Sequence, residues 1–319
     1  MSQFISALVA DKRQVASKIW TFKLAVEPEA FIPARPGAHI DVHLPSGQVR
    51  QYSLCRVPEP NGYDIAVLRE PDGRGGSLEL CDRVSVGDRL QISGPRNNFA
   101  LESGKRHYVL VAGGIGITPL LPMAETLSKA GASFEFHICA ARPEAVPFRS
   151  EIDTAPWSAR VIYHFAEADP STRLIVPEMV KAIGTDAQLY VCGPGRMLDA
   201  VQEATQGWPA GRLRIERFAP IEIAIDPADE GSFSVQAHKS QKSFYVQADT
   251  TLLDALLAHD VYVDSSCHEG TCGTCVTKVL SGDLIHRDSC LYPEEQAAGN
   301  VMAVCVSRAR PGTTLILDV

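Results

Sequence analysis

The sequence predicts a multidomain protein: an antiparallel β-barrel, then an α/β domain with a doubly wound parallel sheet, then a small cysteine-rich domain. Three observations predict this fold class. The chain has 319 residues, which is more than one hydrophobic core usually takes up. Short apolar runs between turn residues give way near residue 105 to apolar strands that alternate with helical stretches. Three cysteines then lie within the segment 267–275.

The predicted domain boundaries follow these changes in pattern. Residues 1–102 hold runs such as "YDIAVLRE" and "DRLQISGP", whose short strands and regular turn signals favour a barrel. Residues 103–222 hold buried-strand runs such as "HYVLVAGG" and "QLYVCGPG", which are typical of a parallel sheet with helices on both faces. Two prolines and several acidic residues in 219–232 indicate a linker, placed at 223–232, and residues 233–319 form the last domain.

Composition excludes several classes of protein. The formal net charge is −8 and no basic stripe is present to neutralise phosphates, so we expect no nucleic-acid partner. No apolar run approaches the length that spans a membrane, and the first residues lack the apolar core of a signal peptide. The sequence therefore predicts a cytoplasmic protein with no membrane association. The nine cysteines are an odd number, which fits poorly with a fully paired disulfide framework.

The cysteine spacing carries the most specific signal in the chain. Cys267, Cys272 and Cys275 follow a C-x4-C-x2-C pattern, and Cys305 supplies a fourth thiol, as in plant-type [2Fe–2S] sites. Small residues separate these thiols, so the loop can fold back over two irons and offer backbone N–H groups to the sulfurs. The small residues are Gly270, Thr271, Gly273 and Thr274.

Two other uses of these cysteines are weighed against the cluster. A structural zinc site more typically shows two CxxC pairs, or one pair with two spaced histidines, and His268 and His286 look like ordinary loop residues. A redox dithiol would stand in a βαβ unit, and no such unit frames this CxxC. The sequence therefore favours the cluster. The cysteines outside the pattern are expected to behave as small apolar residues: Cys55, Cys81, Cys139 and Cys290.

Two glycine-rich turns follow buried strands in the second domain. In "VLVAGGIGITPLL" a strand runs into glycines and then into a helix that is expected to open at Thr118–Pro119, with Thr118 as a cap. Glycines let a phosphate approach the backbone and a helix start favours an anion, although the motif is not the G-x-G-x-x-G fingerprint. "LYVCGPGRM" repeats the arrangement, so both turns should meet at the carboxyl edge of one sheet, where such folds bind ligands.

Two motifs of the first domain together look like a flavin mononucleotide (FMN) site. In "RQYSL", Arg50 offers a forked cation for a phosphate, Tyr52 a flat ring and Ser53 a short hydroxyl. In "GRGGS", Gly75–Gly76 and Ser77 form a loop tight enough to wrap a phosphate with N–H donors. Each motif alone also fits a hairpin end followed by a turn.

Seven stretches of the chain carry a family resemblance: "RQYSL", "GRGGS", "GGIGITP", "YVCGP", "ERF", "SSCHEGTCGTC" and "CVSRARPGTTLILDV". With them the whole chain resembles the phthalate dioxygenase reductase family, which includes the reductase component of vanillate demethylase. The resemblance implies an FMN-binding barrel, an NAD-binding domain and a C-terminal plant-type ferredoxin domain with an α+β β-grasp fold. It also implies transfer of a hydride from NADH to FMN, and of single electrons through the [2Fe–2S] cluster to a Rieske-type aromatic oxygenase.

Two other functions are compatible with the same motifs. Similar reductases serve cytochrome P450 partners, which would change only the electron acceptor. A redox-sensing iron–sulfur regulatory module is the alternative from another class, but no DNA-reading helix or basic patch supports it.

The resemblance also assigns residues to sites. FMN is expected against Arg50, Gln51, Tyr52, Ser53, Ala66, Val67, Leu68, Gly75, Gly76, Ser77, Thr118 and Phe218. NAD is expected against Gly113, Gly114, Gly116, Thr118, Pro119, Arg142, Cys192, Gly193 and Pro194. The catalytic residues, expected around the reacting rings, are Ser53, Thr118, Cys192 and Phe218. The expected cluster ligands are Cys267, Cys272, Cys275 and Cys305.

One position departs from the family pattern. Relatives carry arginine followed by a small or acidic residue after the second sheet strand, whereas this chain reads "CAARPE", with Ala141 before Arg142. An acidic residue here would favour the free ribose 2′-hydroxyl of NADH, and Arg142 offers a cation for the 2′-phosphate of NADPH. NADH is expected from the family, and NADPH stays open.

Overall fold

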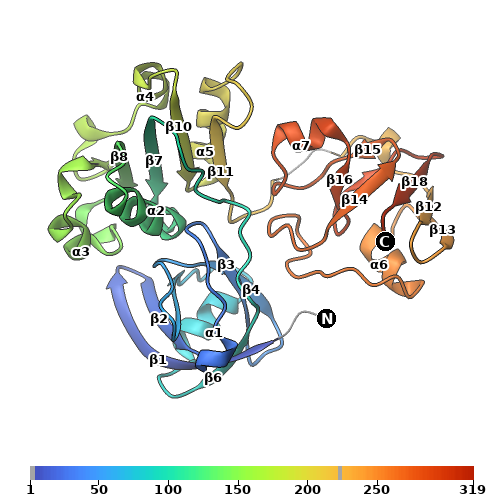
Figure 1. Cartoon of the computed structure of the whole chain (residues 1–319), viewed down its shortest axis with the longest axis horizontal. Coiled ribbons are helices and arrows are strands. Elements are labelled where there is room, and N and C mark those ends of the chain that lie inside the picture. The colour runs from blue at the N-terminus through green and yellow to red at the C-terminus, as the bar shows by residue number, and fades with distance from the viewer. Residues whose placement is uncertain (1–3, 222–224) are drawn as a thin grey trace. The chain divides into compact units, whose positions relative to one another are not determined.

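The computed structural model describes residues 4–221 and 225–319. Contacts divide the chain into two units, one that ends at Glu216 and one that begins at Arg217 (Figure 1). The first unit contains a barrel and a parallel sheet, and the second contains the cysteine-rich domain. The domain limits at residues 102 and 222 stay a prediction.

A six-stranded antiparallel sheet, in the order β4–β3–β6–β1–β2–β5, builds the first part of the first unit. A bridge between Leu54 and Ile65 joins the two ends of the sheet, which closes it into a barrel. Side chains alternate along the strands, so Ile5, Ala7 and Val9 of β1 point into the core. The elements are β1 (Ile5–Ala16), β2 (Ile19–Ala25), η1 (Pro28–Ala30), β3 (His39–His43), β4 (Val49–Ser53), β5 (Gly62–Leu68), α1 (Gly76–Asp82) and β6 (Arg89–Ile92).

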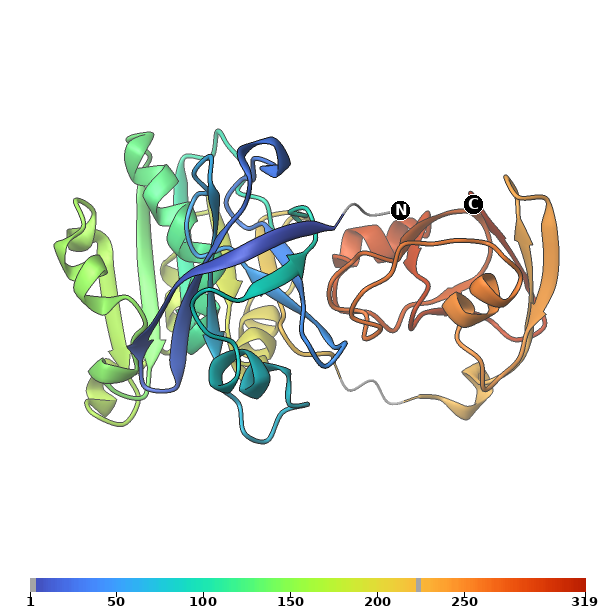
Figure 2. The ribbon, with the colours of Figure 1, turned by 90° about the horizontal axis from the view of Figure 1, so that it is seen from below.

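A five-stranded parallel sheet, in the order β11–β10–β7–β8–β9, builds the second part of this unit. Its strands are apolar because helices cover both faces: α2 and α3 pack on one face, and α4 and α5 on the other (Figure 1 and Figure 2). The elements are β7 (His107–Gly113), η2 (Gly114–Gly116), α2 (Ile117–Lys129), β8 (Phe134–Ala140), η3 (Pro143–Ala145), α3 (Arg149–Thr154), η4 (Ser158–Arg160), β9 (Val161–Phe165), η5 (Pro170–Thr172), α4 (Val176–Ala182), β10 (Ala187–Cys192), α5 (Gly195–Ala204) and β11 (Leu213–Glu216).

The chain order reverses between β7 and β10, which are neighbours in the sheet. One half of the domain winds outward from β7 to β9, and the other half continues from β10 to β11. The carboxyl ends of β7 and β10 therefore form the topological switch point, which is where open α/β sheets bind their ligands.

The second unit is built on a five-stranded mixed sheet in the order β13–β12–β18–β14–β16. Strands β12 and β18 are parallel and the other pairs antiparallel, and helix α6 buries Leu252, Leu253 and Leu256 in the core of this unit. The elements are η6 (Pro227–Asp229), β12 (Phe233–Ala237), β13 (Lys242–Val246), α6 (Leu252–Ala258), β14 (Val276–Ser281), β15 (Leu284–Ile285), α7 (Pro293–Ala298), β16 (Val301–Ala303), β17 (Arg308–Ala309) and β18 (Thr314–Leu317).

Helices in the described ranges are all too short or too polar to cross a membrane.

Candidate functional site

The two motifs predicted to hold the flavin phosphate meet in the structure. Arg50 on β4 lies directly over Gly76 at the start of α1, where an added Cβ would be 2.6 Å from the Arg50 Nε. The Arg50 guanidinium also donates to the Arg74 carbonyl oxygen at 3.3 Å. Gly75 has a φ of +83°, which favours glycine at this turn. The structure thus brings a forked cation and a glycine loop together, which suits a phosphate group.

Most of the other predicted flavin residues lie on β4 and β5, whereas Ser77 is on α1, Thr118 on α2 and Phe218 in the second unit. Burial raises the pKa of the Tyr52 phenol far above its usual value, so this ring is neutral. On β5, Val67 packs in the barrel core, whereas Ala66 and Leu68 pack against the core of the parallel-sheet part. Because its side chain is used in the barrel core, Val67 has only its backbone to offer a cofactor. Ser77 accepts a hydrogen bond from the Glu70 N–H at 3.1 Å, which ties the phosphate loop to the end of β5.

The two glycine turns predicted to bind the dinucleotide are in direct contact. A Cβ on Gly113 would lie 2.5 Å from the Pro194 side chain, and a Cβ on Gly116 would lie 2.2 Å from the Cys192 carbonyl oxygen. A Cβ on Gly193 would lie 3.0 Å from the Gly113 backbone. Only glycines allow these backbones to approach, and the approach leaves the first turn of α2 facing the switch point.

The predicted start of helix α2 was wrong by two residues, because its cap is Gly116 and not Thr118. The helix begins at Ile117 after the turn Gly114–Gly116, so Thr118 is not its cap. The buried Thr118 hydroxyl instead donates to the Ile115 carbonyl oxygen at 3.0 Å. Pro119 is tolerated at the third position because the N–H groups of the first helical turn have no intrahelical partner.

Ser53, Glu216 and Cys192 form a polar junction between the barrel and the parallel sheet. The Ser53 hydroxyl at the end of β4 donates to a Glu216 carboxyl oxygen at 3.1 Å. Glu216 ends β11, in register with Cys192 at the end of β10. Burial raises the pKa of Glu216 to about 8, against the opposing effect of the Ser53 hydrogen bond. The carboxyl group is therefore mostly protonated at neutral pH.

Cys192 is fully buried, and this burial, together with the Glu216 carboxyl, raises the pKa of its thiol well above the usual value. A thiol that stays protonated is a poor nucleophile. Cys192 is therefore not set up for covalent chemistry. Glu216 was missed by the sequence analysis, although it lies in the quoted stretch "ERF" and ends an apolar strand at the switch-point edge.

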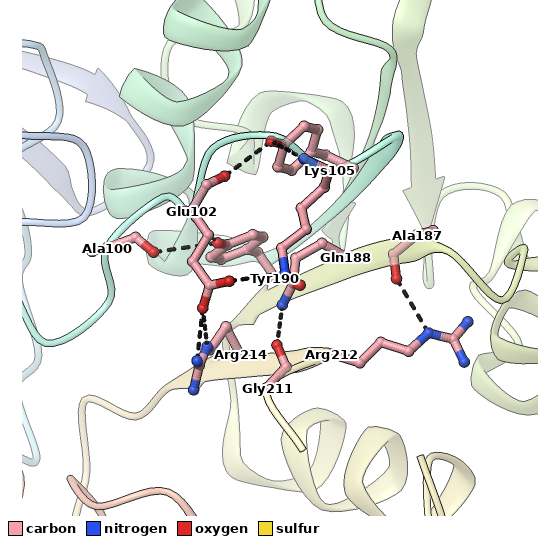
Figure 3. Close-up of polar contacts among 10 residues, drawn as sticks. Ala100, Glu102, Lys105, Ala187, Gln188, Tyr190, Gly211, Arg212 and Arg214 are labelled. Carbon is pink, nitrogen blue, oxygen red and sulfur yellow. Dashed lines mark hydrogen bonds and ion pairs between the residues drawn. The ribbon is translucent and has the colours of Figure 1, made fainter. Parts of the chain in front are cut away.

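The segment that connects the barrel to the parallel sheet is anchored beside this junction (Figure 3). Arg214 of β11 donates to a Glu102 carboxylate oxygen at 2.7 Å, and Lys105 pairs with the other oxygen at 3.0 Å. The Glu102 N–H donates to the Tyr190 hydroxyl at 2.8 Å, and that hydroxyl donates to the Ala100 carbonyl oxygen at 3.2 Å. Since Arg214 and Glu216 share β11, this network also fixes the strand that carries the half-buried Glu216 carboxyl group.

Two of the predicted residues lie away from the junction or outside its unit. Arg142 is exposed, and its guanidinium pairs with the Glu167 carboxylate at 3.1 Å. An acidic side chain therefore lies beside Arg142, the residue predicted to bear on the choice between the ribose 2′-hydroxyl of NADH and the 2′-phosphate of NADPH. Phe218 belongs to the second unit and is 47% exposed, so its place against the flavin stays a prediction.

The four cysteines of the predicted cluster site converge in the second unit. Cys272, Cys275 and Cys305 are buried and Cys267 is partly exposed. Hydrogen bonds from the Cys272 and Cys305 thiols lower the pKa of Cys267, and a hydrogen bond from Cys305 lowers that of Cys275. These contacts link all four thiols, from Cys272 through Cys267 and Cys305 to Cys275. Among the described residues, no group of three or more His, Cys, Asp or Glu side chains is arranged to hold a single metal ion.

The backbone around the thiols is shaped to wrap a group. His268, Gly270 and Gly273 all have φ values in the left-handed region, at 58°, 72° and 68°. The Glu269 N–H donates to the Cys267 sulfur at 3.4 Å, and the Thr274 hydroxyl lies 3.1 Å from the Cys272 sulfur. Backbone and hydroxyl groups directed at sulfur are what an iron–sulfur cluster requires, so the residues present fit a [2Fe–2S] group.

The cysteines outside this loop form no disulfides. Burial raises the pKa of Cys55 to about 12 and that of Cys81 to about 11, as expected for small apolar residues in a core. Cys139 and Cys290 are only partly buried, and burial raises the pKa of both.

Comparisons with known proteins identify two domains and the family of the chain. Residues 6–101 match an oxidoreductase FAD-binding domain, and residues 235–310 match a 2Fe-2S iron-sulfur cluster binding domain. The chain is 42% identical over 318 residues to vanillate O-demethylase oxidoreductase of Pseudomonas putida, covering 98% of this chain and 99% of that protein. It is 36% identical over 318 residues to phthalate dioxygenase reductase of Burkholderia cepacia, covering 99% and 97%. The chain belongs to the phthalate dioxygenase reductase family.

Solved structures support the same assignment. A phthalate dioxygenase reductase structure, titled as a modular structure for electron transfer from pyridine nucleotides to [2Fe-2S], matches with a TM-score of 0.70 at 36% identity and covers 99% of this chain and 98% of that chain. An intact type IV self-sufficient cytochrome P450 monooxygenase matches with a TM-score of 0.89 at 34% identity, covering 99% of this chain but 41% of that chain.

Membership of the phthalate dioxygenase reductase family confirms the predicted fold class. The flavin-binding barrel, the parallel-sheet nucleotide domain and the ferredoxin domain are all present. The chain is a pyridine-nucleotide-dependent oxidoreductase with a flavin and a [2Fe–2S] cluster.

Proposed function

We propose that the chain is the reductase component of an oxygenase system for aromatic compounds, of the Rieske type, and that it takes its electrons from NADH. The observation that carries the proposal is the hydrogen bond between Ser53 and Glu216. It joins the strand with the flavin motif to the sheet edge with the dinucleotide motif. Relatives that match over nearly the whole chain are named as vanillate O-demethylase oxidoreductase and phthalate dioxygenase reductase.

Each part of the chain has a separate task in this proposal. Arg50, with the loop Gly75–Gly76 and Ser77, holds the flavin phosphate. The turns at Gly113 and Gly193 receive the dinucleotide at the switch point. A bound flavin takes up two electrons with a hydride and releases them one at a time, as a [2Fe–2S] cluster requires. The protein therefore has to orient the rings and exclude water rather than supply a strong base.

The polar junction is suited to that task. Ser53 and Glu216 place a hydroxyl and a protonated carboxyl group beside each other without a net charge at neutral pH. The buried Cys192 thiol, in register with Glu216, is a neutral and polarisable neighbour of this pair. Thr118 and Phe218 are proposed at the same ring system, and Cys267, Cys272, Cys275 and Cys305 as the cluster ligands.

Two cofactor choices belong to the proposal. FMN is favoured because Arg50 and Gly76 build a compact phosphate site within the barrel, and because the chain resembles FMN-binding reductases. NADH is favoured over NADPH because the Glu167 carboxylate engages Arg142, which would otherwise be free to accept a 2′-phosphate. We also propose a cytoplasmic location and a transient complex with the oxygenase.

Two measurements test the proposal: the cofactor content of the purified protein, and the rates at which it reduces two different electron acceptors. Purified protein should release FMN on denaturation and contain about two irons and two sulfides per chain, as a [2Fe–2S] centre requires. With NADH it should reduce a purified Rieske oxygenase faster than a purified cytochrome P450. Release of FAD would overturn the FMN assignment, and faster P450 reduction would favour the second acceptor, for which the match to the P450 monooxygenase is the specific support.

A further inference from the structure

Asp288 and Ser289, which follow β15, pack against the loop that carries the first three cysteines. The Ser289 N–H donates to the Gly270 carbonyl oxygen at 2.9 Å. Gly270 lies between Cys267 and Cys272, and a Cβ there would be only 3.0 Å from the Asp288 Cα. The loop backbone and the backbone at Asp288 are therefore in direct contact, with no side chain between them.

Asp288 carries a carboxylate with no exposed surface. One of its oxygens accepts from the Leu291 N–H at 2.9 Å and from the Cys290 thiol at 3.5 Å. The other oxygen accepts from the Ser307 hydroxyl at 3.2 Å and lies 3.5 Å from the His286 Nδ1. Four polar groups thus surround one buried carboxylate, which offsets part of the cost of removing it from water.

The same carboxylate is linked to the last cluster ligand. Ser307, which is fully buried, stands two residues after Cys305 and also accepts from the Arg287 N–H at 3.0 Å. The Arg287 guanidinium is directed elsewhere, since it pairs with the Glu230 carboxylate at 2.7 Å. Asp288 is therefore tied to the loop that holds three of the cysteines and to the segment that follows the fourth.

Burial raises the pKa of Asp288, but the nearby His286 ring and hydrogen bonds from the Leu291 N–H and the Cys290 thiol outweigh it and hold the pKa below its usual range. The group is therefore ionised at neutral pH. A negative charge in a poorly solvated site opposes the arrival of an electron nearby, and the potential of an iron–sulfur cluster depends on such charges.

We propose that Asp288 is a positioning residue for the [2Fe–2S] cluster, and that its buried negative charge makes the reduction potential of the cluster more negative. The inference rests on the proposed cluster ligands and adds to them a residue outside the cysteine pattern. It also predicts that the hydrogen bonds to this carboxylate tune the potential, because each donor withdraws part of the charge.

The test is a redox titration of the cluster, followed by electron paramagnetic resonance, in the full-length protein. Asp288→Asn keeps the shape of the side chain and removes its charge, so the midpoint potential should shift in the positive direction. Asp283→Asn is the matched control, because it removes an exposed carboxylate from the turn just before β15. Asp288→Asn with the same potential as Asp283→Asn would overturn the proposal.

A second variant keeps the test decisive if Asp288→Asn fails to hold iron. Ser307→Ala keeps the carboxylate but removes one of its donors, so the potential should shift in the negative direction. A side chain with a merely structural role would not produce shifts of opposite sign, and no shift in Ser307→Ala would contradict the tuning. Iron and sulfide are measured in the wild-type protein in parallel. Their absence there would refute the proposed ligands, whereas normal content with unshifted variants would refute only the role of Asp288.

Discussion

Glu216 stands where the barrel meets the parallel sheet, with a pKa that burial raises to about 8. Below that pH the group is neutral, and above it the group carries a negative charge. An ionised carboxylate at the junction opposes the negative charge that a hydride brings. We therefore expect flavin reduction by NADH to slow several-fold as the pH rises through about 8.

Stopped-flow measurement on both sides of that pH checks this expectation. Glu216→Gln stays neutral throughout, so its reduction rate should not show the decline. Glu203→Gln, on the exposed face of α5, serves as the control and should behave like the wild type. An identical decline in Glu216→Gln would assign the pH dependence to another group.

Cys305 is separated from the other three cluster cysteines in sequence but meets Cys267 and Cys275 in space. Cys305→Ser should lose most of its iron and its visible cluster absorption while it retains flavin, because the two cofactors occupy different units. Cys290→Ser is the matched control, since Cys290 lies close to the loop but outside the pattern. Iron content is measured in both variants after anaerobic reconstitution. Full iron in Cys305→Ser would contradict the ligand assignment.

Among the secondary-structure elements, the short helix α1 shows how the flavin loop is held. The Glu79 carboxylate of α1 accepts from both the backbone N–H and the hydroxyl of Ser46, in the turn between β3 and β4. Lys12 of β1 donates to the Cys81 and Val84 carbonyl oxygens at the other end of the helix. These contacts fix the distance between β4, which carries Arg50, and the glycine loop.

We expect Glu79→Leu to weaken flavin binding by roughly tenfold, or about 1.4 kcal/mol, because the hydrogen bonds to Ser46 are lost. Glu79→Gln keeps an acceptor and should restore most of the affinity. Fluorescence titration of the flavin-free protein measures both, with Glu59→Leu in an exposed turn as the control. Equal affinity in Glu79→Leu and wild type would show that the helix is held without this contact.

How much of the structure the sequence could predict differs from one element to the next. The cysteine loop and the glycine turns could be predicted because their residues are close in sequence and their spacing reports the chemistry directly. The junction of Ser53 with Glu216 could not, since its partners are 163 positions apart and only the closed fold brings them together. Asp288 and Ser307 are only 19 positions apart, but nothing in their spacing signals that the two side chains meet. The start of α2 was misplaced because the preceding glycine turn continues directly into the helix.

For the whole molecule, the segment predicted as a linker is partly bound to the second unit. Asp229 pairs with Arg310 at 3.2 Å, and Glu230 pairs with Arg287 at 2.7 Å. We expect the double variant Asp229→Asn, Glu230→Gln to be cut by protease in this segment several-fold faster, because ion pairs no longer hold it. Limited proteolysis measures the rate, and Asp249→Asn, at an exposed turn, is the control. Unchanged cleavage would show that the ion pairs do not restrain the segment.

The central claim is that one chain contains the whole path from pyridine nucleotide through flavin to the iron–sulfur cluster. The most direct test is to mix NADH with the anaerobic protein, freeze the sample rapidly and follow the reduced cluster by electron paramagnetic resonance at several protein concentrations. Our account predicts that the cluster becomes reduced after the flavin, at a rate that does not depend on protein concentration. A cluster that stays oxidised while the flavin is reduced, or a rate that rises in proportion to protein concentration, would contradict it.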